Sequence, residues 1–422
     1  MLIGDEIYNP EHWGNFHLIC ETFAAKRRET PLSFCESKIY PSMWHVTKHS
    51  DIFTIEMATD VFLNEPRVLI SELKEEERIR SMNNGSLHQI RHLLTYDGEE
   101  HIKMRRLTQS WFMPKNLIMV SGIIQKSAEK ALEALKNKHG ECNFAEDVAL
   151  EYPFRVIMQL LGVSEEDQPR ILRATLILFG AQDPTIRERF LPPGASISGA
   201  RDEAVNDFNT FLINLIKDRM ASPRDDLATI IANAEIDGKP IDIAAKIGYF
   251  IIICTAGHDT TSNTLTEAVY QLALDPGLLA KLKANPDEIM PKLTEEALRY
   301  AAPVRHFIRT ANRDFELRGQ IIKKDDPVVL WYLSGSRDEE VFPDPDRFDI
   351  DRSQKTRHAS FGHGPHLCLG MHLARLEIAA FLKAFSSIVK SISLTGTPTY
   401  SRTTFVGGIY DLPVKIELES RF

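Results

Sequence analysis

Hydrophobic and polar positions follow a helical period through the middle of the chain and a strand-like alternation on either side of it. From residue 101 to about residue 300, apolar positions recur with the spacing of one helix face. Strand-rich stretches with β-branched residues and turn signals lie near 40–70 and 303–335. We therefore expect a predominantly α fold with smaller β-sheets (α+β), in which a sheet can draw strands from both ends of the chain.

The length of the chain is compatible with one unusually large domain. Its 422 residues exceed the roughly 250 to 300 that one hydrophobic core usually serves. Because no repeat, linker or low-complexity segment divides the sequence, we expect residues 1–422 to form a single domain. The longest apolar stretch, 247–256, is far shorter than the ~20 residues that a membrane span requires, so we expect no membrane segment.

Charge and cysteine content narrow the partners and the compartment. The net charge of -9 repels phosphate backbones, so we expect no nucleic-acid partner. The five cysteines are an odd number and form no CxxC pair, which argues against a disulfide framework. Since the first residues also lack the basic start and apolar stretch of a signal peptide, we expect a cytoplasmic location.

One cysteine lies in a segment with an unusual composition. Residues 361–370, FGHGPHLCLG, carry three glycines and a proline, which exclude a regular helix or strand and predict a shaped loop. Leucines at helical spacing follow directly, so Cys368 is expected at or just before a helix N-terminus. The positive end of that helix would lower the pKa of the thiol and stabilise a thiolate. The plain alternative is a buried cysteine without chemistry.

A second unusual segment interrupts the apolar helix predicted near residue 250. Gly257, Asp259, Thr260 and Thr261 are poor helix formers inside the run IIICTAGHDTTSN. An Asp beside a Thr in apolar surroundings must find hydrogen-bond partners or water. The segment is either a polar kink with satisfied hydrogen bonds or a proton relay.

Both motifs resemble those of the cytochrome P450 family. The family's haem loop reads Phe, two residues, Gly, one residue, Arg or His, one residue, Cys, one residue, Gly, and FGHGPHLCLG fills every defined position. The family's central-helix pattern is Ala or Gly, Gly, any residue, Asp or Glu, Thr, and Thr or Ser, and residues 256–261 fill it. The resemblance implies a cytochrome P450 fold, with a long central helix over a haem b (iron protoporphyrin IX).

The resemblance also assigns roles around the iron. Cys368 would be the axial ligand of the haem iron, and Phe361 would pack on the proximal side of the haem. Gly370 would leave space beside the sulfur. On the other face, Thr260 would hold dioxygen-derived groups and a water, while Asp259 would pass protons inward so that the O–O bond breaks heterolytically.

Further residues correspond to the family's haem-propionate partners and to a buried structural triad. The propionate partners would be His101, Arg105, Arg309, His358 and His366. The triad would consist of Glu296, Arg299 and Arg347, with a structural rather than a catalytic role. Taken alone, the helical spacing of His101 with Arg105 fits an ordinary helix surface equally well, and that of Glu296 with Arg299 is more typical of a solvated surface pair.

The resemblance places a substrate pocket between segments far apart in sequence. It would involve the region near 175–200 and six residues: Leu94, Ala256, Val304, Phe307, Phe405 and Val406. The segments AGHDTTS, APVRHFIRTA and TTFVGG are similar to sequences of the bacterial branch typified by a terpineol-hydroxylating member. That similarity favours a compact hydrophobic substrate, such as a monoterpenoid or an alkylaromatic compound.

The leading functional hypothesis is a haem-thiolate monooxygenase that inserts one oxygen atom from O2 into a C–H bond. A 2Fe-2S ferredoxin and its reductase would supply electrons to a monomeric enzyme, docking near Lys103 and Arg106. One alternative is a peroxygenase driven by hydrogen peroxide, against which the intact Asp259–Thr260 pair counts. Another is a non-catalytic haem-binding sensor, for which a relay and an apolar pocket would be superfluous.

Overall fold

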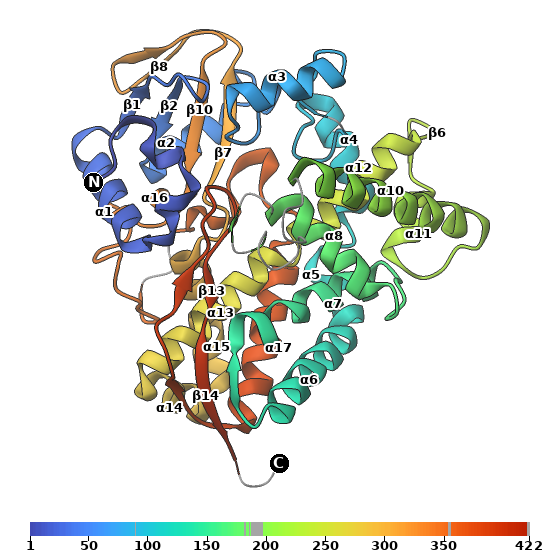
Figure 1. The fold of residues 1–422 in the computed structure, drawn as a ribbon, viewed down its shortest axis with the longest axis vertical. Coiled ribbons are helices and arrows are strands. Elements are labelled where there is room, and N and C mark those ends of the chain that lie inside the picture. Colours follow the sequence, from blue (N-terminus) through green and yellow to red (C-terminus); the bar gives the residue numbers. More distant parts are fainter. Residues whose placement is uncertain (89, 181–182, 185, 187–196, 353–355, 420–422) are drawn as a thin grey trace.

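The computed structural model describes residues 1–88, 90–180, 183–184, 186, 197–352 and 356–419. A β-rich lobe contains the N-terminus, and a larger helical body fills the rest of the view (Figure 1). The lobe combines a five-stranded sheet with helices α1 (Phe16–Glu29), α2 (His49–Met57) and α16 (Tyr332–Gly335). The prediction of a mainly helical protein with smaller sheets is confirmed.

The five-stranded sheet joins strands from distant parts of the chain. Its order is β1 (Leu32–Cys35), β2 (Met43–Val46), β10 (Pro327–Trp331), β7 (His306–Ala311) and β3 (Phe62–Leu63). Strands β2 and β10 run parallel, and the other neighbouring pairs are antiparallel. Every residue of β2 and β10 is buried, as expected for central strands covered on both faces. Strands from both ends of the chain therefore share one sheet, as the sequence predicted.

The helical body is built around α13 (Asp259–Leu274). This helix packs against α7 (Glu151–Leu160), α15 (Pro286–Ala301) and α17 (Met371–Ile388), and α6 (Ser121–Asn137) packs against α7 and α17. The buried apolar residues of these helices belong to the largest hydrophobic core. Because apolar residues line one face of each helix, burying those faces together positions α13 and the start of α17 next to each other.

The remaining elements surround this body. Among the described residues, the other α-helices are α3 (Leu73–Met82), α4 (Gly98–Gln109), α5 (Pro114–Leu117), α8 (Gln168–Gly180), α10 (Ile197–Ala221), α11 (Leu227–Ala232), α12 (Ile243–Ala256) and α14 (Pro276–Ala284). A three-stranded sheet has the order β11 (Val389–Leu394), β14 (Pro413–Leu418) and β4 (Glu141–Asn143). Two-stranded sheets pair β5 (Glu235–Ile236) with β6 (Lys239–Pro240), β8 (Phe315–Leu317) with β9 (Gln320–Ile322), and β12 (Thr399–Tyr400) with β13 (Ile409–Asp411). Among the described residues, no helix is long and apolar enough to cross a membrane.

The long central helix runs as two consecutive helices, α12 and α13. They are separated at Gly257 and His258, next to the poor helix formers seen in the sequence. The carbonyl of Ala256 accepts a hydrogen bond from the Thr260 hydroxyl at 2.9 Å, so a side chain replaces part of the backbone ladder. A Cβ at Gly257 would lie 2.6 Å from Cδ1 of Ile157, which shows that α7 packs tightly against the break.

Candidate active site

The cysteine loop leads directly into a helix. Cys368 lies two residues before Gly370, which caps the N-terminus of α17. The Cys368 N–H donates to the Phe361 carbonyl at 2.9 Å, which closes the loop. Gly364 has a φ of +64°, and a Cβ there would lie 2.5 Å from the Glu56 carbonyl oxygen, so this turn requires glycine. The predicted position of Cys368 just before a helix is confirmed.

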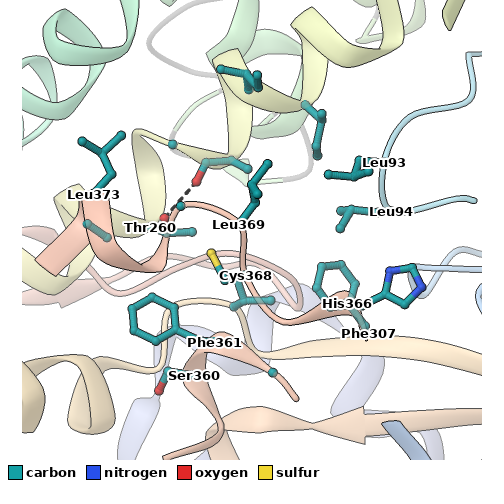
Figure 2. A pocket seen from close by; sticks show the side chains of 18 of the residues that line it. Leu93, Leu94, Thr260, Phe307, Ser360, Phe361, His366, Cys368, Leu369 and Leu373 are labelled. Atoms are coloured by element: carbon teal, nitrogen blue, oxygen red, sulfur yellow. Dashed lines mark hydrogen bonds between the residues drawn. The ribbon is translucent and has the colours of Figure 1, made fainter. Parts of the chain in front are cut away.

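The sulfur of Cys368 is directed into a cavity between the loop and the central helix (Figure 2). Thr260 lines the same cavity from α13, and Leu369 and Leu373 contribute apolar surface to its wall. Seven of the predicted haem-contacting residues line this cavity: His101, Arg105, Arg309, Phe361, His366, Cys368 and Gly370. Residues separated by more than two hundred positions in sequence are thus brought to one site.

The electrostatics of the thiol differ from the expectation. Burial raises the pKa of Cys368 above its ordinary value, and this outweighs the lowering by the Gly370 N–H, Arg105 and Arg375. The helix start and the cations therefore offset the effect of burial only in part. A coordinating metal ion removes the proton of its thiol ligand outright, so the raised pKa is compatible with a thiolate ligand.

A cluster of cationic and donor groups lies on one side of the cavity. The His101 and His366 rings stack with centroids 3.8 Å apart, and Asn64 links His366 to Asp97 through contacts of 2.8 Å. Burial together with the nearby arginines lowers the pKa of His101 to about 4 and that of His366 to about 2. The buried Nε2 of His101 has no hydrogen-bond partner among the described residues.

These features fit a bound haem. Two arginines beside neutral imidazoles give the site a positive charge that an anion must balance. The two propionates of a haem would supply this negative charge. Anionic oxygens near the cluster would also satisfy the unpartnered Nε2 of His101. The open space beside Gly370, where a Cβ would meet no atom within 4 Å, leaves room next to the sulfur.

A second cavity adjoins the first and reaches the predicted substrate pocket. Leu94, Ala256, Val304 and Phe307 line it together with Phe405 and Val406, so all six pocket candidates are brought together. Phe307 and Phe405 lie with ring centroids 5.5 Å apart, and an isolated β-bridge pairs Val304 with Val406. From the region near 175–200, Leu176, Asp183 and Ile186 contribute to the lining, while residues 181–182, 185 and 187–196 lie outside the described residues.

The polar residues of the helix break face these cavities. Thr260 lines both cavities and Asp259 lines the second. His258 is buried, with Nδ1 3.0 Å from the Cys254 carbonyl and Nε2 2.9 Å from Asp259 Oδ1. Burial lowers the pKa of His258, but Asp259 and the Cys254 carbonyl outweigh it, so the pKa lies above its ordinary value. The acid of the predicted relay thus has a charged partner next to it in sequence.

The structure does not place His358 where a haem-propionate partner was predicted. His358 is buried with Nε2 3.5 Å from Glu295 Oε2, and its Nδ1 accepts the Ser360 N–H. It is not among the described residues that line the cavity of Cys368. The reason is the short 3-10 helix Ala359–Phe361, which His358 caps, so that its ring lies against α15 instead of the cavity.

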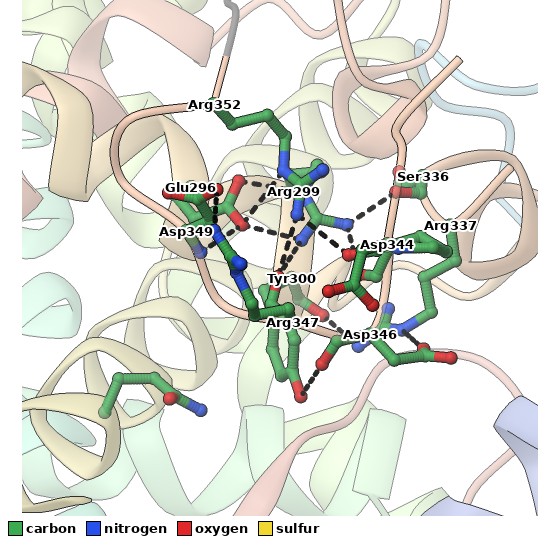
Figure 3. A network of polar contacts seen from close by, with 12 residues as sticks. Glu296, Arg299, Tyr300, Ser336, Arg337, Asp344, Asp346, Arg347, Asp349 and Arg352 are labelled. Atoms are coloured by element: carbon green, nitrogen blue, oxygen red, sulfur yellow. Dashed lines mark hydrogen bonds and ion pairs between the residues drawn. The ribbon is translucent and has the colours of Figure 1, made fainter. Parts of the chain in front are cut away.

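The predicted triad is correct for two members and wrong for the third (Figure 3). Glu296 and Arg299 form a buried pair at 2.7 Å. The Arg347 guanidinium instead pairs with Asp349 at 2.6 Å and is 64% exposed, and only its carbonyl reaches Arg299. Arg352 takes the expected place, with Nε 3.4 Å from Glu296 Oε1. The loop folds back because the Asp349 N–H donates to Glu296, which brings Arg352 onto the pair.

The two cations expected to contact a redox partner differ in their surroundings. The Lys103 ammonium lies 3.0 Å from Glu99 and 2.8 Å from Asp237, so its charge is shared between two carboxylates. Arg106, on the same helix, is exposed. Arg106 is therefore the more available of the two for an acidic partner.

The sequence analysis missed several residues of the site, four of which are polar groups near the proposed haem or relay. His258 carried a signal, since it lies inside the AGHDTT motif beside the acid. Glu56, Asn64 and Tyr332 carried none, because each belongs to the β-rich lobe and reaches the cavity only through the tertiary fold.

Comparisons with known proteins agree with this site. The sequence model of the family described as Cytochrome P450 matches residues 43–387. The chain is 37% identical over 409 residues to cytochrome P450-terp of a Pseudomonas species, with 96% of this chain and 95% of that protein covered. It is 29% identical over 394 residues to linalool 8-monooxygenase of Pseudomonas putida, with 93% of this chain and 94% of that protein covered.

Solved structures give the same result. The crystal structure of CYP108D1 from Novosphingobium aromaticivorans DSM12444 superimposes with a TM-score of 0.90 at 37% sequence identity. The match covers 98% of this chain and 97% of that one. Together with the family match over residues 43–387, this places the fold and the cysteine loop in one family. The chain belongs to the cytochrome P450 family.

Proposed function

We propose that this cytochrome P450 monooxygenase inserts one oxygen atom from O2 into a C–H bond of a compact hydrophobic substrate. The observation that carries the proposal is that the Cys368 sulfur and the Thr260 side chain line one cavity, which continues into an apolar chamber. A haem b held in this cavity, with the Cys368 sulfur as the ligand of its iron, would supply the chemistry of dioxygen binding and reduction. All of residues 1–422 act as one monomeric, cytoplasmic domain in this proposal.

The propionate partners in this proposal are His101, Arg105, Arg309 and His366. Arg105 and Arg309 provide fixed positive charge, and the imidazole N–H groups donate hydrogen bonds. Phe361 covers the proximal side near Cys368. These residues would hold a haem in the cavity that Thr260 also lines.

Thr260 and Asp259 move protons in the proposed reaction. The Thr260 hydroxyl uses its hydrogen on the Ala256 carbonyl, which leaves its oxygen lone pairs available to accept a hydrogen bond from a water or from dioxygen-derived groups. Asp259 lines the second cavity and can exchange protons with water there. His258, at 2.9 Å, holds the Asp259 carboxylate by charge.

A monoterpenoid or an alkylaromatic compound is the substrate class that we propose. The chamber walls around Leu94, Val304, Phe307, Phe405 and Val406 are apolar, so they favour binding of a hydrocarbon surface. The name of one relative, linalool 8-monooxygenase, states a terpenoid substrate for that protein. Electrons reach the haem from a 2Fe-2S ferredoxin and its reductase, with Arg106 and Lys103 as docking cations.

A spin-state titration tests the substrate class. The haem-loaded protein is titrated with monoterpenoids, alkylbenzenes, steroids and fatty acids while the Soret band is followed. We expect saturable shifts with the compact compounds and weaker binding in Phe307→Ala, whereas Phe315→Ala, a part-buried Phe outside both cavities, should bind normally. Shifts with steroids or fatty acids alone would contradict the substrate class.

Turnover distinguishes the monooxygenase from the alternatives. Product should form with NADH, ferredoxin reductase and ferredoxin, and one oxygen atom of the product should come from O2. Equal activity with hydrogen peroxide alone would favour a peroxygenase. A protein that binds haem but oxidises none of the compounds would be a sensor rather than an enzyme.

A further inference from the structure

Glu56 is a buried carboxyl group in the wall of the haem cavity, and the proposed function gives it no role. It lies on α2, and its side chain is 2% exposed. The Tyr332 hydroxyl donates to Glu56 Oε1 at 2.6 Å, and Arg309 Nη2 lies 3.5 Å from the same oxygen. The other oxygen, Oε2, is buried and has no hydrogen-bond partner among the described residues. A buried carboxyl oxygen without a partner costs free energy unless something else contacts it.

The carboxyl group also contacts the loop that carries Cys368. A Cβ at Gly362, where φ is +67°, would lie 3.1 Å from Glu56 Oε1, so the glycine allows a close approach of the loop. The backbone N–H of His363 donates to the carboxyl group and lowers its pKa. Glu56 therefore connects Arg309, a proposed propionate partner, with the cysteine loop.

Several charged and titratable groups face Glu56. Arg309 comes from β7, Tyr332 follows β10, and the cysteine loop contributes the N–H of His363. Across the cavity lie His101 and Arg105 of α4, His366, and Glu377 of α17. Burial raises the pKa of Glu56 to about 7, against the lowering by Arg309, Tyr332 and His363.

We propose that Glu56 is a further haem-binding group, whose protonated carboxyl donates a hydrogen bond to a haem propionate and whose proton uptake is coupled to reduction of the iron. The inference rests on a haem occupying the cavity of Cys368. A propionate at Arg309 would come close to Glu56, and two carboxylates cannot share one buried site without a proton between them. The unpartnered Oε2 is the atom that would carry this proton.

The coupled step balances in charge and atoms. One electron from an external reductant would convert Fe(III) to Fe(II), and one proton from the acid form of the solvent buffer would form the O–H bond of the Glu56 carboxyl, leaving the buffer base in solution. Reduction removes one positive charge from the haem, so a nearby carboxylate is less stabilised and its pKa rises. The reduction potential must therefore fall as pH rises, with a slope that approaches ~59 mV per pH unit for one proton and one electron.

The test is the pH dependence of the reduction potential of the haem-loaded protein. Spectroelectrochemical titrations between about pH 6 and about pH 8 should give a falling potential in the wild type. Glu56→Gln, which keeps the shape and a hydrogen-bond donor, should give a flat profile. A matched control is Glu377→Gln, since Glu377 is a buried carboxyl group that lines the same cavity from α17, and burial likewise raises its pKa above the ordinary value.

An unchanged slope in Glu56→Gln, or a slope lost in Glu377→Gln, would overturn the proposal. If Glu56→Gln does not retain haem, the proposal is tested on the wild type alone, with infrared difference spectra between its oxidised and reduced forms. Reduction should then produce a protonated-carboxyl band that shifts in D2O, and its absence overturns the proposal. The carbonyl spectrum of the reduced protein reports on the Cys368 ligand independently, so a failure of the haem-thiolate assignment would be seen separately.

Discussion

His258 Nε2 lies 2.9 Å from Asp259 Oδ1, so the acid of the proposed relay is paired with the residue directly before it. The histidine is buried while the carboxyl side chain is 28% exposed toward the second cavity. This arrangement holds Asp259 in place and leaves it access to water. It also makes the pair sensitive to pH.

The first prediction concerns the pH dependence of this pair. Because Asp259 and the Cys254 carbonyl overcome the effect of burial and raise the pKa of His258, the charged form stabilises the folded state below the unfolded pKa of about 6.5. That contribution is lost as pH rises through the raised pKa. A double-mutant cycle with His258→Phe and Asp259→Asn should give a coupling of about 1 kcal/mol near pH 6 and less near pH 9.

The exposed pair His17–Glu21, 3.1 Å apart, is the control for that cycle. Solvent screens it, so its coupling should not be measurable in denaturant unfolding at either pH. A His258–Asp259 coupling that grows with pH would contradict the sign of the His258 pKa shift.

A second prediction concerns Thr260. Thr260→Ala should retain haem and bind substrate but divert electrons from NADH to hydrogen peroxide, because the hydroxyl that accepts hydrogen bonds in the cavity is lost. Thr266→Ala is a matched control, since Thr266 makes the same bond to the carbonyl four residues earlier but lies outside both cavities. Peroxide and product are quantified per NADH consumed. Full coupling in Thr260→Ala would count against the relay.

A third prediction concerns the iron ligand. Cys368→Ala should abolish the red-shifted Soret band of the reduced carbonyl complex, because a thiolate ligand produces that band. Cys142→Ala should keep it, since Cys142 lies outside the cavity of Cys368. An unchanged band in Cys368→Ala would reject the ligand assignment.

A fourth prediction separates the three arginines around Glu296. Arg299→Ala removes the nearest cation of the buried Glu296 carboxylate, leaves only Arg352 at 3.4 Å, and should lower the free energy of unfolding by about 3 to 5 kcal/mol. Arg352→Ala loses the contact with Glu296 and the hydrogen bonds to the carbonyls of Asp344 and Arg347. It should lower the free energy of unfolding by about 1 to 2 kcal/mol. Arg347→Ala removes an exposed side chain, so its effect should stay within about 0.5 kcal/mol.

Denaturant unfolding of the haem-loaded protein measures these differences. The order Arg299, Arg352, Arg347 follows from the distances and exposures around Glu296. If Arg347→Ala were as damaging as Arg299→Ala, the side chain of Arg347 would belong to the triad after all.

Sequence patterns sufficed wherever a functional group depends on its own neighbours. The loop around Cys368 must be irregular because of its glycines and proline, and the next leucines predict the helix that follows. The polar residues of AGHDTT likewise mark the break between α12 and α13. Both statements depend on spacing within about ten residues, where local backbone geometry decides the structure.

The contacts of single side chains could not be predicted in this way. The triad was assigned to Arg347, yet a hydrogen bond from the Asp349 N–H to Glu296 turns the loop and brings in Arg352. His358 faces Glu295 because the short helix after it orients the ring. In the triad, a displacement of a few residues along the loop decides which cation reaches the buried Glu296 carboxylate.

The sequence by itself determined the family, the helical and strand-rich regions, the cysteine loop and the polar break in the central helix. Only the tertiary structure decided that Glu56, Asn64 and Tyr332 of the β-rich lobe reach the cavity of Cys368, and that the sulfur and Thr260 share that cavity. The physical reason is that periodicity and local composition report the conformation of contiguous residues. Burial, charge pairing and pKa shifts depend instead on which distant segments the packing of the core brings together.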